Sequence, residues 1–201
     1  MFKRFFDAGN PLMQGLAIAA DLLFLNLLTL VCCLPVFTAG AALTALSDLA
    51  QQLVRGEETY VLRGYFRSFR SNFKKGCLLG LIFLGAAALV WLDYRVALAV
   101  MPVMRFAAAA VGVLVLAAAI YAFALQARFE NSLGGTLKNA LALVPAYFPV
   151  TLGMVVCTLA LWIIALRFIN YALPVMLMFG LSLPAYVCAQ LYKGVFEKLA
   201  R

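Results

Sequence analysis

The chain has 201 residues, of which 66% are hydrophobic and only 12% are charged. Soluble domains have roughly 45–50% apolar and about 25% charged residues, so this composition excludes a water-soluble monomer. Lys and Arg number 16 against 8 Asp and Glu, and His is absent, which excludes His-based metal sites and catalytic pairs.

The charged residues delimit apolar runs that are long enough to span a membrane. A helix needs about 20 residues to cross a hydrocarbon core of about 30 Å, and backbone groups in lipid must be paired within the segment. We therefore predict an all-α integral membrane bundle of five or six hydrophobic helices. The predicted spans cover residues 16–37, 76–95, 106–127, 143–166 and 169–192.

Residues 16–54 are too long for one straight span, because a single helix over them would measure about 58 Å. Pro35 and Gly40 lie near the middle, so we predict that the first helix breaks near Pro35–Gly40. Residues 41–54 then form a weaker helix, which either returns through the membrane or lies shallow in it. Asp48 indicates that the far end of this helix meets water.

The distribution of Lys and Arg predicts the orientation, because cytoplasmic loops carry an excess of these residues. The five-span topology and the hairpin topology both place the C-terminus in the cytoplasm of a multi-pass cell-membrane protein. If residues 41–54 return, Lys3 and Arg4 join the basic side, which strengthens the charge bias. The hairpin requires a short polar helix to return through lipid, so both alternatives remain open at this stage.

Residues 60–75 form the most informative polar segment. Their basic residues recur at steps of four, three and four, which places them in one stripe on a helix beside a stripe of aromatic residues. We predict a helix along the membrane surface, with its rings among the headgroups and its cations toward the anionic inner leaflet. Lipid would cover this face, so nucleic acid is not an expected partner. The residues assigned to membrane-surface or partner binding are Arg63, Tyr65, Phe66, Arg67, Phe69, Arg70, Phe73 and Lys74.

Two polar residues, Asp21 and Asn26, lie within the first predicted span. A carboxylate at the centre of a membrane helix costs about 2.5–3.5 kcal/mol on insertion, so such residues are candidates for a functional site. A proton or ion site and a structural or interfacial role are the two interpretations. Gly76 and Gly80 form a GxxxG pair in the second span, a pattern that permits close approach of helices.

No sequence motif for catalysis is present. The chain lacks a P-loop, GxSxG, HExxH and paired carboxylates at useful spacing. The five cysteines lie in or beside apolar runs without a Cys-x-x-Cys pair, so we interpret them as small apolar packing residues. We predict no enzymatic activity, no cofactor and no metal.

Three segments carry a pattern in common with a known family. Residues 20–46 end in a Pro followed by Thr-x-Gly-Ala, residues 53–76 contain Arg-x-Glu-Glu and Phe-x-x-Asn-Phe-Lys, and residues 127–141 contain Ala-Arg-Phe-x-Asn-Ser-Leu. In this order they resemble the YesL-like family of small bacterial multi-pass membrane proteins. That family has no established activity and no agreed catalytic residues.

The resemblance implies a gene setting near carbohydrate ABC transporters. We therefore expect a non-enzymatic membrane accessory protein that assists carbohydrate uptake or its regulation beside an ABC transporter. Its expected partners are the bilayer, a sugar transporter or regulatory membrane protein, and further copies of the chain. The alternative is a small oligomeric transporter or channel for a small solute, ion or proton, motivated by Asp21, Asn26 and the prolines near the last spans.

Overall fold

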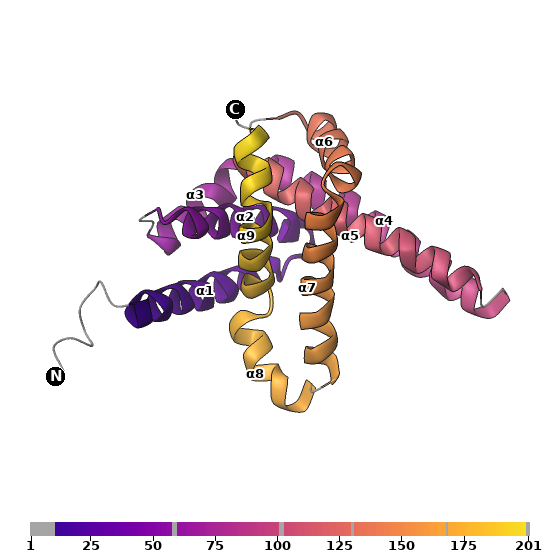
Figure 1. Ribbon diagram of the computed structural model, residues 1–201, viewed down its shortest axis with the longest axis horizontal. Helices are drawn as coiled ribbons and strands as arrows, with labels where there is room; N and C mark the ends of the chain where they lie inside the picture. Colours follow the sequence, from indigo (N-terminus) through magenta and orange to yellow (C-terminus); the bar gives the residue numbers. More distant parts are fainter. Residues whose placement is uncertain (1–10, 58–59, 101–102, 130, 168, 200–201) are drawn as a thin grey trace.

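The computed structural model describes residues 11–57, 60–100, 103–129, 131–167 and 169–199, and in these residues all regular structure is helical (Figure 1). Lys3 and Arg4, which entered the prediction of topology, lie outside the described residues. The helices are α1 (Pro11–Cys33), the 3-10 turn η2 (Val36–Thr38), α2 (Ala39–Arg55), α3 (Val61–Ser71), α4 (Phe73–Val100), α5 (Met104–Arg128), α6 (Leu133–Ala146), α7 (Phe148–Arg167), α8 (Ile169–Phe179) and α9 (Ser182–Leu199).

Four helical segments of the described chain are long and apolar enough to cross a membrane. They are Gly15–Cys33, Phe73–Ala97, Met104–Arg128 and Phe148–Arg167. The helices α4 and α5 pack side by side and extend away from the rest of the molecule (Figure 1). Large apolar side chains such as Leu89 and Phe106 are exposed along them, as expected for helices surrounded by lipid. The fold is therefore that of an all-α, multi-pass membrane protein.

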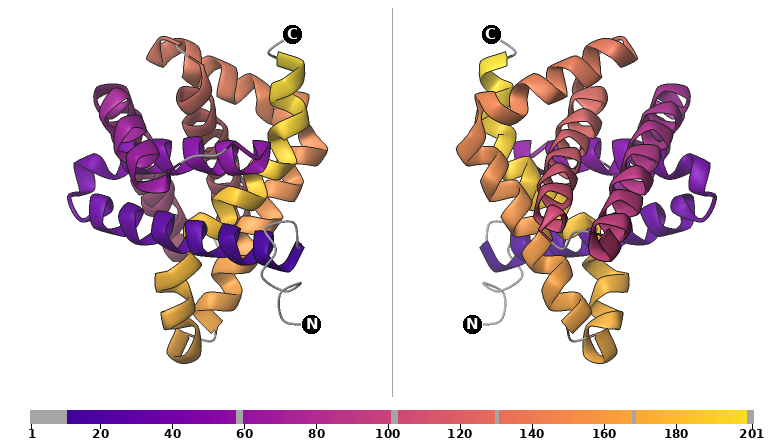
Figure 2. Two further views of the ribbon diagram at one scale, coloured as in Figure 1. Left: turned by 90° about the vertical axis from the view of Figure 1, so that its left-hand side faces the viewer. Right: turned by 90° about the vertical axis from the view of Figure 1, so that its right-hand side faces the viewer.

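The helix α2 is enclosed by the other helices. It packs against α1, α3, α4, α5 and α9, and most of its residues from Gly40 to Gln51 are buried. It returns along α1 (Figure 2). Leu46 and Leu49 of α2 lie in one apolar cluster with Leu22 and Leu25 of α1. The weak apolar character of this helix follows from that position, because it contacts protein on all sides and needs no lipid-facing surface.

The break between α1 and α2 lies where the sequence predicts it. The helix α1 ends at Cys33, and Pro35 and the turn η2 reverse the chain. The hydroxyl of Thr38 donates to the carbonyl oxygens of Cys32, at 2.6 Å, and Pro35, at 2.7 Å. The bond to Cys32 satisfies a carbonyl that the end of α1 leaves without a partner, and the carbonyl of Pro35 also accepts from the backbone N–H of Thr38.

Two predicted spans are divided in the structure. The run over 143–166 is split at Tyr147, between α6 and α7, where Pro149 has no N–H to continue the ladder and fits the first turn of α7. The run over 169–192 is split at Gly180 and Leu181, between α8 and α9. The surface helix predicted over 60–75 ends at Ser71, so Phe73 and Lys74 belong to the first turn of α4.

Candidate functional site

The helix α3 is docked on the bundle by one face. Val61, Tyr65 and Ser68 are buried on that face, while Arg63 and Arg67 are exposed on the opposite one. Phe66, Arg70, Phe73 and Lys74 are also exposed, and Phe69 is half-buried. Among the described residues, none of the four cations of this segment forms an ion pair. Seven of the eight residues predicted to bind the membrane surface or a partner are thus exposed or half-buried.

Tyr65 is the exception, because its side chain is fully buried rather than at the membrane surface. Its hydroxyl donates to the carbonyl oxygen of Ala42 in α2, at 3.4 Å, and its ring stacks on Phe69 with 6.3 Å between ring centroids. Burial raises the pKa of the Tyr65 hydroxyl well above its ordinary range. The sequence does not show which aromatic ring is buried, because Tyr65 and the exposed Phe66 are adjacent.

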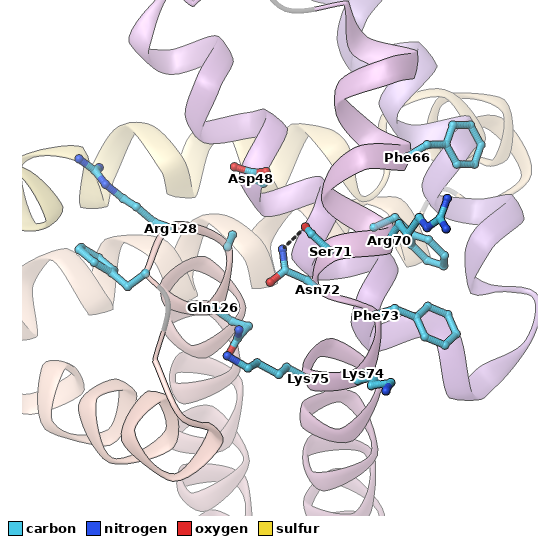
Figure 3. A pocket seen from close by; sticks show the side chains of 13 residues that line it. Asp48, Phe66, Arg70, Ser71, Asn72, Phe73, Lys74, Lys75, Gln126 and Arg128 are labelled. Carbon is cyan, nitrogen blue, oxygen red and sulfur yellow. Dashed lines mark hydrogen bonds between the residues drawn. The ribbon is translucent and has the colours of Figure 1, made fainter.

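A polar cleft opens between the α3–α4 junction and the end of α5. It has a volume of about 1140 Å³ and also receives Asp48 from α2 (Figure 3). Its lining residues are Asp48, Phe66, Phe69, Arg70, Ser71, Asn72, Phe73, Lys74, Lys75, Gln126, Ala127, Arg128 and Phe129. This cleft is not predicted from the sequence, because four helices assemble it, and α5 lies far along the chain from α2, α3 and α4. The only local signal was the clustering of basic residues at the ends of two spans.

The floor of the cleft contains polar side chains, and hydrogen bonds to neighbouring residues hold two of them in place. The side chain of Gln126 is 3% exposed, and its Oε1 accepts a hydrogen bond from the hydroxyl of Thr136 at 3.2 Å. The ammonium of Lys75 donates to the carbonyl oxygen of Asn131 at 3.0 Å. Asp48 is half-buried between these elements, and it has no hydrogen-bond or ionic partner within the described part of the chain.

Asn26 has a structural role in the bundle interior. Its side chain is fully buried, and its amide nitrogen donates to the carbonyl oxygen of Leu177 at 2.7 Å. Its side-chain oxygen accepts from the backbone N–H groups of Leu181, at 2.8 Å, and Ser182, at 3.1 Å. One side chain thus caps the end of α8 and the start of α9, where both helices leave backbone groups without partners.

Asp21 lies one and a half turns before Asn26 on α1 and is half-buried. It has no side-chain partner among the described residues. The structure therefore does not bring the two intramembrane polar residues into one site. In the described ranges, no group of three or more Cys, Asp or Glu side chains lies close enough to hold a metal ion.

Comparison with known sequences gives one family. Residues 22–94 match a family profile described as "Protein of unknown function, DUF624". The match covers the second half of α1, all of α2 and α3, and most of α4. No curated protein and no solved structure matches the chain. Over residues 22–94, the chain is therefore similar to the DUF624 family of unknown function.

Proposed function

We propose that this protein is a non-enzymatic membrane accessory protein, which uses the exposed face of α3 to bind the inner leaflet and a membrane partner. The observation that carries the proposal is the way α3 is held. One face is fixed on the bundle through Tyr65, while Arg63, Phe66 and Arg67 project from the other without ionic partners among the described residues. A rigid helix that presents cations and rings is suited to a surface contact.

The position of α3 along the chain supports a contact with lipid. Only Asn72 separates its last residue, Ser71, from the candidate span that begins at Phe73. Each cation close to an anionic membrane surface contributes about 1 kcal/mol. Arg63, Arg67 and Arg70 together would hold the helix on the inner leaflet, and this orientation places the C-terminus in the cytoplasm.

The proposed protein partner is a carbohydrate ABC transporter or one of its regulators. The resemblance of residues 20–46, 53–76 and 127–141 to YesL-like proteins supports this partner class. The exposed face of α3 is the proposed contact, because it combines charge with aromatic area in one rigid helix.

The test is recovery of partners from native membranes in a mild detergent. We expect an ABC permease, a sensor kinase or a sugar-binding lipoprotein to be recovered with the tagged chain. The double variant Arg63→Gln/Arg67→Gln should lose it. Arg105→Gln removes an exposed cation at the start of α5, far along the chain from α3, and serves as the matched control. Recovery of the chain alone, or equal recovery with both variants, contradicts the proposal.

A small transporter or channel is the second candidate. The break between α8 and α9 favours it, because discontinuous helices line the binding sites of many transporters. Asn26 already uses its amide in capping that break, so Asp21 is the remaining intramembrane candidate. Flux of an ion, proton or sugar in reconstituted vesicles, lost in Asp21→Asn, would support this function, and absence of flux would reject it.

A further inference from the structure

We propose that the polar cleft between α2, the α3–α4 junction and α5 binds the headgroup of one amino-phospholipid, with its phosphate on Lys75 and Gln126 and its ammonium on Asp48. This site shares Phe66 and Arg70 with the exposed face of α3, but its proposed ligand groups Asp48, Lys75 and Gln126 lie outside that helix, and it requires no protein partner. Its volume of about 1140 Å³ is sufficient for a headgroup with accompanying water.

The position of the cleft at the ends of two candidate membrane spans supports a lipid as the occupant. The candidate span of α4 begins at Phe73, and that of α5 ends at Arg128. These two helices pack against each other with opposite chain directions, so both residues mark the same polar end of the hairpin. Both line the cleft, which places it where the headgroups of the surrounding leaflet lie.

The phosphate end of the site is built from groups with donors to spare. Lys75 uses one donor on Asn131 and has two more. Gln126 is 3% exposed, its oxygen is used by Thr136, and its amide nitrogen has no partner among the described residues. Because this nitrogen is not one of the buried atoms, it can donate from the wall of the cleft to a phosphate oxygen. In Figure 3, Lys75 and Gln126 approach each other across the floor of the cleft.

Asp48 is the residue that would bind the ammonium of the headgroup. Among the described residues it is the one acidic residue that lines the cleft, and the other charged lining residues are Arg70, Lys74, Lys75 and Arg128. No ion pair joins it to any of them within the described chain. Figure 3 shows it beside Asn72 and Ser71 and apart from the guanidinium of Arg128. A ligand with a phosphate and a primary ammonium complements this arrangement, whereas a purely anionic headgroup leaves Asp48 facing the same sign of charge.

The test measures lipid retention by the full chain, purified in mild detergent, stripped of lipid and examined by native mass spectrometry. The probes are phosphatidylethanolamine, its mono- and dimethyl derivatives, phosphatidylcholine and phosphatidylglycerol. We expect one tightly held phosphatidylethanolamine, with retention falling as methyl groups remove the N–H donors. Equal retention of phosphatidylethanolamine and phosphatidylcholine, or stronger retention of phosphatidylglycerol, would overturn the proposal. This series needs no variant, so a folding defect cannot obscure it.

Variants then test the proposed contacts to the ammonium and to the phosphate separately. We expect Asp48→Asn to reduce the preference for phosphatidylethanolamine over phosphatidylcholine about tenfold, as for loss of a charge-assisted hydrogen bond. Lys75→Gln and Gln126→Leu should weaken retention of both lipids. The Arg63→Gln/Arg67→Gln variant should keep the bound lipid, so loss of the α3 contact and loss of this site give different results. Displacement of the lipid by millimolar inorganic phosphate would assign the site to a soluble phosphate instead and overturn the lipid assignment.

Discussion

Gly40 of α2 and Gly80 of α4 meet backbone to backbone. A Cβ atom on Gly40 would lie 2.6 Å from the Cα of Gly80, and a Cβ on Gly80 would lie 2.6 Å from the Cα of Gly40. Gly76, one turn before Gly80, is similarly close to Ala41, so the GxxxG pair of α4 receives the start of α2. The first turn of α2 can therefore pack directly against α4, because no glycine side chain separates the two backbones.

Replacing Gly80 with Ala should push α2 away from α4. Because the neighbouring atoms belong to backbone and cannot rotate aside, we expect the free energy of unfolding to fall by about 1–3 kcal/mol. Gly85→Ala is the matched control, since it lies on the same helix and a Cβ there meets nothing within 4 Å. Thermal unfolding in detergent measures both. Equal effects of the two substitutions would contradict the close packing of Gly40 on Gly80.

Replacing Asn26 should destabilise the junction of α8 and α9. Asn26→Leu removes the hydrogen bonds to Leu177, Leu181 and Ser182, and we expect a loss of about 1–3 kcal/mol or more, because buried backbone groups are left without partners. Asn26→Asp keeps an acceptor but loses the donor, so it should also be destabilising. Leu27→Ala, at an exposed position of the same helix, is the control. Native stability in Asn26→Leu would show that the cap is dispensable.

Substitutions at Tyr65 and Phe66 should have different effects, because Tyr65 packs inside the bundle and Phe66 is exposed. Tyr65→Ala leaves a cavity in a fully buried site and should cost about 3–5 kcal/mol, by analogy with other large-to-small aromatic substitutions. Phe66 is 53% exposed, so Phe66→Ala should leave the unfolding temperature nearly unchanged. Instead it should weaken membrane or partner contact by α3, measured by recovery of partners. A reversal of these two effects would contradict the assigned burial.

The pair Arg55–Glu57 should show a small dependence on pH. The guanidinium of Arg55 bonds to Glu57 and lowers the pKa of that carboxyl below its ordinary value of 4.5. A lowered pKa in the folded state gives stability that is present above the unfolded pKa and is lost as pH falls through the folded one. The contribution is at most about 1 kcal/mol, because both side chains are partly exposed.

Carboxyl ¹³C chemical shifts of Glu57 measure its titration directly. We expect the pKa to rise toward its ordinary value in Arg55→Gln. A value that does not move in that variant would show that another group lowers it.

Helix type and the approximate positions of several spans could be predicted from sequence, whereas the enclosed position of α2 could not. A run such as 106–127 is recognised because lipid requires uniform apolarity, and α5 covers it. The residues of α2 need not be uniformly apolar, because their neighbours are five other helices and not lipid. Its small residues Gly40 and Ala41 have a clear meaning only once α4 is placed against them.

The candidate sites were partly predictable for the same reason. The exposed cations of α3 follow from local spacing, but Asp48, Asn72 and Gln126 enter one cleft only because α2, the α3–α4 junction and α5 converge. The position of Asn26 within a predicted span marks it as a candidate from the sequence alone. Its partners lie 150 residues or more away in sequence, so its role as a cap was not visible there.

The enclosed helix α2 sets an order on the biogenesis of the protein. Its walls include α5, through the bond from Gln51 to the carbonyl oxygen of Ala124, and α9, through the bond from Lys193 to the carbonyl oxygen of Val54. A nascent chain that ends before α9 has therefore made α2 long before its last neighbour exists. The polar side chains of α2 therefore enter the membrane region before α9, the helix that completes their surroundings, has been synthesised.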